Sequence, residues 1–454
     1  MVQLMANPAM KETDPYLETF ERFEAQAKQP PWVFPLRKAG IARFAELGFP
    51  TLDQEDWRFT NVAPIARLPF KPVFQVSSDS LTPEAVAQFT FGRLDASRLV
   101  FVNGHYAAEL SSAPGPQPAG VIVSSLAAAL AGDSGLLKQH LESYPQGEDN
   151  PFAALNAAFF QDGALIYVPA GKRLEAPVHL LFISTAKEAG ATSQPRNVII
   201  AEKGSQVTVL ESYVSTGESS YFTNVVTELI LGEGAMVEHA KFQDESRNAY
   251  HMAAIHARLG RGCNFIAHSI ATGARLSRNS IHTALAGEGV ACVLNGLYLT
   301  RGDQLADHHM VVEHAQPHCT SHEYYNGILD GHSKGVFHGR ILVRQAAQKT
   351  DAKQTNKNLL LSDDATVDTK PQLEIYADDV KCTHGATIGQ LNEESIFYLR
   401  ARGIGAETAR RMLIHAFAGE IIERIRHTPA RDELDKLVWE RLEQHPRIGE
   451  KKSV

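Results

Sequence analysis

The sequence predicts a mainly β protein whose centre is a β-solenoid, with helical segments before and after it. Between residues 163 and 394 helical periodicity nearly vanishes, and short apolar runs bounded by Gly, Asp and Asn replace it. Within this stretch a Gly-x-Gly turn recurs at 232–234, 260–262 and 287–289, with a spacing of about 28 residues. Such a period suits one solenoid coil, which buries its inward side chains by stacking on its neighbours. An immunoglobulin-like sandwich is the alternative, but it has fewer strands and leaves the turn period unexplained.

Residues 1–160 are expected to form a helical and mixed N-terminal domain. Apolar Tyr16, Phe20 and Phe23 recur at helical spacing and predict a helix over 15–27, which ends before Pro30 and Pro31. The expected elements that follow are a helix over 36–47, a strand over 98–102, one or two helices over 126–143, a loop over 144–150 and a helix over 151–160.

The β-helix core is expected to span residues 161–394. Its apolar runs predict strands over 165–168, 178–183, 197–201, 206–214, 225–231, 236–242, 253–259, 265–270, 290–299, 335–343, 358–361 and 373–376.

A C-terminal helical domain is expected over residues 395–454. The helix predicted over 405–425 has an apolar stripe of Ala409, Met412, Leu413, Ala416, Phe417 and Ile421. A second, more charged helix is predicted over 432–444. The stripe allows two interpretations, since it suits docking of a partner and packing onto the chain's own β body.

Composition narrows the function classes. The 454 residues are 44% hydrophobic and 21% charged, which is typical of a folded globular protein and excludes disorder over most of the chain. The net charge of −8 argues against nucleic-acid binding through bulk charge. We expect no membrane span and no secretory signal. Four widely spaced cysteines do not make a disulfide framework, so we expect a reducing, cytoplasmic location.

Histidine is unusually abundant, with 19 residues in the chain. Six potential ligands fall close together: His308, His309, His314, His318, Cys319 and His322. On alternating strands, His308, His314, His318 and His322 share a parity and would line up, while His309 and Cys319 would point away. The spacing allows a zinc or iron site, but the pattern favours structural or interface side chains that stack along one face and need no metal.

Cys382 and His384 are two residues apart on an extended segment, so they project to the same side. A thiolate and an imidazole together can hold iron with sulfur. Two ligands are too few for a stable metal site. Either a second protein completes the metal site, or Cys382 and His384 bind no metal.

Several ordered stretches carry a family resemblance: AQKTDA at 347–352, NLLLS at 358–362, PQLEIYADDVKC at 371–382, HGAT at 384–387 and FYLRARGI at 397–404. They resemble the SufB/SufD family of the SUF iron–sulfur cluster assembly machinery, strongly over about 160–425 and more loosely before it. SufB-like members carry a glutamate where this chain has Gly385, and a cysteine where it has Ala365. The resemblance is therefore to SufD-type members, and a SufB-like main scaffold is the alternative.

The resemblance implies a right-handed parallel β-helix and a non-catalytic scaffold subunit. Such a subunit pairs with SufB through the β-helix edges, binds the ATPase SufC and contributes to iron acquisition. A nascent cluster would form at the SufB interface, with His384 as ligand and Cys382 close by. No cofactor would stay bound to the isolated chain, which could form a homodimer. No nucleic acid or membrane would be a partner.

The resemblance places SufC docking on the C-terminal helical segment. The residues expected there are Phe397, Tyr398, Arg400, Arg402, Gly403, Met412, Leu413, Ala416 and Phe417.

Two further hypotheses come from other classes. A polysaccharide-active β-helix enzyme would use grouped carboxylates, for which Asp363, Asp364, Asp378 and Asp379 are candidates. A free-standing histidine-rich metal-binding protein is the other.

Overall fold

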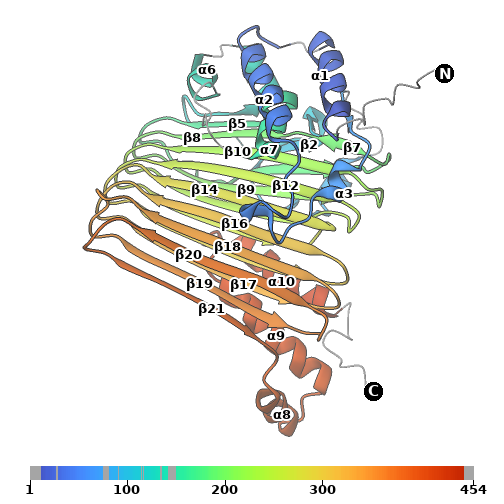
Figure 1. The fold of residues 1–454 in the computed structure, drawn as a ribbon, viewed down its shortest axis with the longest axis vertical. Coiled ribbons are helices and arrows are strands. Elements are labelled where there is room, and N and C mark those ends of the chain that lie inside the picture. Colours follow the sequence, from blue (N-terminus) through green and yellow to red (C-terminus); the bar gives the residue numbers. More distant parts are fainter. Residues whose placement is uncertain are drawn as a thin grey trace, which may run out of the picture.

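The body of the protein is a parallel β-helix, as predicted, with helices from both ends of the chain packed against it (Figure 1). The computed structural model describes residues 12–26, 29–74, 81–89, 91–113, 115, 117–132, 135–141 and 150–443. Two sheets face one another along the whole body, and the chain alternates between them.

The first sheet has eleven strands among the described residues. They are β1 (Lys71–Pro72), β4 (Ile122–Ser125), β5 (Ala164–Val168), β7 (Ala191–Ser193), β8 (Arg196–Ala201), β10 (Phe222–Leu231), β12 (Tyr250–Leu259), β14 (Leu276–Leu285), β16 (Leu305–His314), β18 (Lys334–Val343) and β20 (Thr366–Ile375). From β8 to β20, successive strands of this sheet are parallel neighbours.

The second sheet has ten strands among the described residues. They are β2 (Ser97–Val102), β3 (His105–Tyr106), β6 (Val178–Ser184), β9 (Gln206–Ser215), β11 (Met236–Asp244), β13 (Asn264–Ala271), β15 (Ala291–Thr300), β17 (Thr320–Leu329), β19 (Asp351–Leu360) and β21 (Lys381–Gly389). Because β2 pairs with β6, the N-terminal region contributes to the first coils.

Three of the ten-residue strands escaped the sequence prediction: β14, β16 and β17. The short strands β1, β3, β4 and β7 were not predicted either. The three long ones have a common cause. They are rich in polar side chains that the fold buries, such as Asn279, His308 and Glu323. An apolar-run criterion cannot detect a strand whose inward side chains are polar. The predicted strand over 373–376 is also longer in the structure, since β20 begins at Thr366.

The recurring glycine turns are explained by two separate constraints. Gly262 has a positive φ of 60°, a conformation that costs a residue with a Cβ atom. Gly260 instead lies against the preceding coil, where a Cβ atom would be 2.7 Å from the carbonyl oxygen of Leu231. The first glycine therefore permits close stacking of coils and the second permits the turn.

Stacking of the coils aligns equivalent residues into inward columns. One column of the second sheet contains Val207, Val237, Phe265, Cys292, Ser321, Ala352 and Cys382. Its first members are buried in the main apolar core, which the β-helix encloses. The last member belongs to the final strand, where the next coil is missing.

The N-terminal helices cover the outer face of the first sheet, at the upper end of the body in Figure 1. They are α1 (Asp14–Gln26), α2 (Val33–Leu47), η1 (Glu55–Trp57), α3 (Ala63–Ala66), α5 (Leu126–Ala131), α6 (Gly135–Leu141) and α7 (Pro151–Phe159). The short helices α4 (Pro83–Val86) and η2 (Ala108–Leu110) pack instead against β2, β6 and β9 of the second sheet. An aromatic cluster that includes Tyr16, Phe44 and Phe152 packs against Phe222 and Tyr250 of the sheet.

The predicted helix over 126–143 is two helices, α5 and α6, and its last two residues lie outside the described residues. Residue 27 and all of the loop predicted over 144–150 except Asn150 also lie outside them. Asn150 caps α7, since its side-chain oxygen accepts from the backbone N–H groups of Phe152 and Ala153. No described helix combines the length and hydropathy that a membrane crossing requires.

The C-terminal helices are α8 (Glu393–Ala401), α9 (Ala406–Ile422) and α10 (Thr428–Glu443). Helices α9 and α10 cover the outer face of the second sheet, where Ile414, Ile421 and Leu434 pack against residues such as Leu297 and Ile328. Helix α8 projects beyond the end of the β body (Figure 1).

The apolar stripe predicted for α9 is wrong in part. The buried residues of α9 are Ala409, Ile414, Ala418, Gly419, Ile421 and Ile422, whereas Met412 and Ala416 are exposed. The helix is rotated relative to the prediction because Ile414 and Ala418 fit the sheet. Met412 and Ala416 are thus left for solvent or a partner.

Replacing Ile421 with alanine is expected to destabilise the packing of α9 and α10 by about 2–5 kcal/mol, because it opens a cavity against the sheet. Hydrogen exchange of the α9 amides measures the loss. Met412→Ala on the exposed side is the control and should change the free energy of unfolding by at most about 0.5 kcal/mol. Equal losses in both variants would contradict this orientation of α9.

Candidate functional site

The β-helix ends in an open edge at β21. This strand pairs with β19 on one side, and no described strand pairs with its other side. Lys381 N–H donates to the Thr350 carbonyl oxygen at 2.8 Å, so alternate residues from Lys381 bond to β19. The backbone groups of Cys382, His384 and Ala386 therefore face outward, unpaired. Such an edge is a template for a strand of another chain.

The neighbouring edge of the first sheet, β20, differs from β21 in one respect. Thr366 N–H donates to Ser333 across the ladder, so by alternation Pro371 turns its nitrogen outward. Proline has no N–H, and its position blunts the edge of β20. Large apolar side chains nevertheless remain exposed at this end of the body, including Tyr376 (61%) and Ile388 (51%).

Cys382 lies at the rim of the apolar interior. It packs, half-buried, against a cluster that contains Val343, Ala352 and Ala377. Burial, and then the Asp351 carboxylate, raise the pKa of Cys382 above the ordinary value of a thiol. The side chain is therefore protonated near neutral pH in the isolated chain and is a poor ligand until a metal or partner changes its surroundings.

His384 is the exposed end of a polar column. Its register partner is Gln354, whose amide donates to Glu323 at 2.8 Å. Because His384 shares its parity with Cys382, both side chains lie on the same face of β21, as predicted from their spacing. Neither Glu323 nor Gln354 was selected from the sequence. The sequence signal that could have identified them is their spacing, which is about the length of one coil of the β-helix.

Gly385 and Ala365, on which the expected resemblance to SufD-type members depends, lie in different surroundings. Gly385 is exposed on β21, and a Cβ atom there would meet no atom within 4 Å. Ala365 is buried before β20 among Ala271, Tyr298 and Leu329. The absence of a side chain at Gly385 is thus not imposed by space within this chain.

The histidines between residues 308 and 322 do not line up on one face, contrary to the prediction from their parity. His308 is buried inside the β-helix, 3.3 Å from the Ser269 hydroxyl, and His314 bonds to the Ser321 hydroxyl at 2.8 Å. His318 lies in a turn at a positive φ of 60°, so the alternation restarts after it. Cys319 is buried, and its sulfur is 3.2 Å from the Gly287 carbonyl oxygen.

The residues expected to dock a partner are mostly accessible. Phe397 and Tyr398 on α8 are 72% and 56% exposed, and the Arg402 guanidinium lies 4.6 Å from the centre of the Tyr398 ring. Arg400, Gly403, Met412 and Ala416 are also exposed, while Leu413 and Phe417 are half-buried. Phe417 contacts the apolar cluster beneath α9, so part of this group also packs onto the chain itself.

The acidic pairs do not form one catalytic group. Asp363 and Asp364 are in the turn before β20, whereas Asp378 and Asp379 are in the turn before β21, at the other end of the coil. Asp364 is 3.6 Å from His332, and Asp379 pairs with Lys349. This arrangement does not favour a polysaccharide-active enzyme.

Two family models match the chain. The model described as "SUF system FeS cluster assembly, SufBD core domain" matches residues 182–417, and "SufBD protein N-terminal region" matches residues 10–180. This chain belongs to the SufBD family. The family works in iron–sulfur cluster assembly by the SUF system.

Curated relatives agree with this assignment. A SufBD family iron–sulfur cluster assembly protein of Synechocystis is 35% identical over 86% of this SufBD chain and 86% of the relative. The iron–sulfur cluster assembly protein SufD of Escherichia coli is 32% identical over 90% of this chain and 93% of its own. The chloroplastic protein ABCI7 of Arabidopsis thaliana is 30% identical over 88% of this chain and 84% of its own.

Proposed function

We propose that this chain is a SufD-type, non-catalytic scaffold subunit of the SUF complex in the cytoplasm. It pairs with SufB through its β-helix edge, binds the ATPase SufC through the C-terminal helical domain, and contributes to a nascent cluster at the SufB interface and to iron acquisition. The open edge of β21, which bears Cys382 and His384 side by side, is the observation that carries this proposal.

The edge supports a shared site better than a self-contained one. Among the described residues, an apolar cluster and the amide of Gln354 lie beside Cys382 and His384, and no three metal-ligating side chains gather there within 4.8 Å of one another. A thiol whose pKa is raised binds iron only when the metal displaces its proton. A partner that supplies further ligands and covers the edge would provide both conditions, so the cluster is transient and shared with SufB.

SufC docking is supported by the exposed rings of α8. Phe397 and Tyr398 extend beyond the β body on a short helix, and aromatic residues are enriched among interface hot spots. Exposed Met412 and Ala416 extend this surface onto α9. The division into domains 1–160, 161–394 and 395–454 is part of the proposal, with the last domain as the SufC contact.

The SufB-like alternative is weaker. A main scaffold of that type would carry a cysteine at the position of Ala365, and here the methyl group is buried among apolar side chains. The SufD resemblance of the chain agrees with the E. coli SufD match.

Co-purification tests the proposal. Tagged chain is expressed with SufB and SufC, and iron and sulfide are measured in the complex for the parent and for His384→Ala. We expect a stoichiometric complex in both and a depleted cluster in the variant, because the edge imidazole is lost. His332→Ala, which removes another exposed imidazole in the turn before β18, is the matched control and should leave the cluster content unchanged.

Two outcomes would contradict the proposal in different ways. A normal cluster content in His384→Ala would remove His384 from the chemistry and leave the complex intact. Failure of SufB and SufC to co-purify with the parent chain would overturn the assignment as an assembly subunit.

A further inference from the structure

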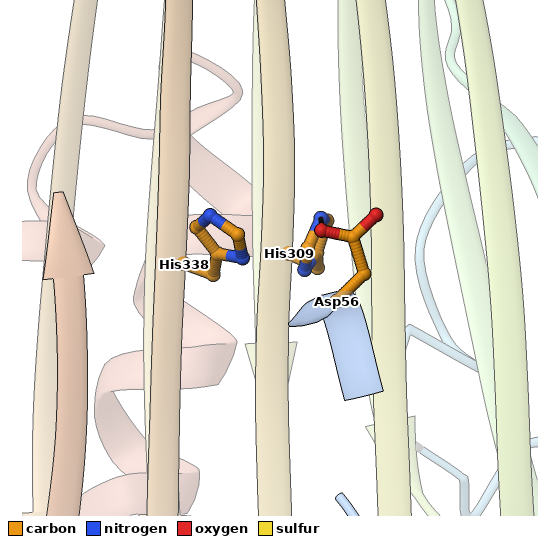
Figure 2. A group of neighbouring side chains, drawn as sticks. All are labelled: Asp56, His309 and His338. Atoms are coloured by element: carbon orange, nitrogen blue, oxygen red, sulfur yellow. Dashed lines mark ion pairs between the residues drawn. The ribbon is translucent and has the colours of Figure 1, made fainter. Parts of the chain in front are cut away.

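Three potential metal ligands meet on the outer face of the first sheet, on the two strands next to its edge strand β20. His309 on β16 and His338 on β18 are register partners on neighbouring strands, and their ring centres are 4.2 Å apart. Asp56 reaches them from η1 in the N-terminal region, with a carboxylate oxygen 3.7 Å from Nε2 of His309. Figure 2 shows the two rings side by side, with Asp56 beside His309.

The three side chains lie close together but do not satisfy one another's hydrogen-bonding groups. One ligand atom from each lies within 4.8 Å of the others, but His309 and Asp56 are too far apart for a good hydrogen bond. Nδ1 of His309 is buried and has no hydrogen-bond partner among the described residues. Buried polar atoms are usually paired, so an unpartnered imidazole nitrogen beside a second imidazole and a carboxylate requires an explanation.

Both rings are neutral near pH 7 and can act as ligands. Burial, and then the charge of Arg278, hold the pKa of His309 well below its usual range. Burial, and then Lys370, also lower the pKa of His338. Neutral imidazole is the form that binds a metal, so no proton has to be displaced.

The cations near the cluster are each paired with a carboxylate of their own. Arg278 bonds to Asp307 at 2.6 Å and also donates to the backbone oxygen of Asp56 at 2.8 Å. Lys370 pairs with Glu55.

The third cation, Arg340, lies 3.7 Å from Glu374. Within the described residues, Asp56 has no ion pair except that with His309. Among these carboxylates, that of Asp56 is therefore the one that can balance the positive charge of a bound ion.

We propose that Asp56, His309 and His338 form a binding site for a divalent first-row transition-metal ion. Two imidazoles and one carboxylate are a ligand set for zinc or iron(II), with remaining positions open to water. Bonds of about 2.0–2.2 Å would require the ligand atoms to approach one another more closely than they do here. Asp56 is exposed on a short turn and can make this movement.

Neighbouring side chains also fix the positions of the proposed ligands. The side-chain oxygen of Gln372 on β20 lies 3.5 Å from Nε2 of His338, in a position to orient the ring. Trp57, next to Asp56, stacks on the guanidinium of Arg278 at 3.8 Å and fixes the turn to the sheet. A bound ion would thus join the N-terminal region to two coils of the β-helix.

The experiment uses the full chain with Cys382→Ser and His384→Ala as background, so that the proposed edge site cannot contribute. After chelation, Zn²⁺ is titrated by calorimetry and Co²⁺ by its visible absorption. We expect one ion per chain and a rise in Tm on Zn²⁺ addition. Asp56→Asn and His338→Gln should each weaken binding by at least about 10–100-fold, the range found even for loss of an outer-shell partner.

His332→Ala is the control, since it removes an exposed histidine that also faces an aspartate but has no second imidazole beside it. Its affinity should equal that of the background chain. Absence of Zn²⁺ binding in the background chain would overturn the proposal, and so would equal affinities in Asp56→Asn, His338→Gln and background. Circular dichroism confirms that each variant is folded. Because the background lacks both edge residues, neither result bears on the role of Cys382 and His384.

Discussion

Replacing Ala386 with proline is expected to leave the chain folded and to reduce co-purification with SufB sharply. Ala386 lies in the middle of β21, and by alternation its N–H faces outward from the edge. Proline is tolerated on an edge strand when the missing N–H faces solvent, as Pro371 shows in β20. Its ring would remove a donor and occupy the space of a pairing strand, weakening association by on the order of 10–100-fold.

A matched control separates the edge from the side chain. Ala386→Ser changes the same exposed position but keeps the outward N–H, so the SufB complex should form normally. Co-purification and size-exclusion chromatography measure both variants, and circular dichroism checks the fold. Normal SufB pairing of a folded Ala386→Pro variant would show that β21 does not pair by strand addition. If the isolated parent chain is a homodimer, its loss in the same variant would locate that contact at β21 too.

The parts of the fold that the sequence predicts are those in which one local rule acts alone. The turn glycines recur because every coil needs the same reversal, so their period predicts the solenoid without any knowledge of pairing. Strands such as β10 have mostly apolar inward residues and were predicted within a few positions. Cys382 and His384 project to the same side because residues two positions apart on a strand always do.

The parts that the sequence does not predict depend on contacts between distant segments. Buried polar residues concealed β14, β16 and β17, because the β-helix pairs such side chains with one another inside the body. The orientation of α9 depends on the surface of the sheet beneath it. The cluster of Asp56, His309 and His338 combines the N-terminal region with two coils, and no spacing within one segment reveals it.

Glu323→Gln is expected to stabilise the protein at neutral and alkaline pH. Burial raises the pKa of the Glu323 carboxyl to about 7, although the Gln354 amide opposes the shift by donating to it. The folded state therefore binds this proton more tightly than the unfolded state, whose carboxyl has an ordinary pKa near 4.5. The stabilisation from this proton is complete below that pH and is lost as the pH rises to about 7. A neutral glutamine avoids the loss, which is on the order of 3 kcal/mol.

The measurement is the difference in the free energy of unfolding between variant and parent, from urea titrations at several pH values between 4 and 8. Other buried groups titrate in the same window, such as His314, whose pKa burial lowers to about 4. Their contributions cancel in the difference. Glu407→Gln, on the exposed side of α9, is the control for the change from a carboxyl to an amide. A flat difference for Glu323→Gln would mean that Glu323 is ionised as readily as an exposed carboxyl, with water reaching the column beneath His384. A difference that grows up to about pH 7 would mean that water does not reach Glu323 in the isolated chain. The column of Glu323 and Gln354 beneath His384 would then be uncharged before any partner covers the edge.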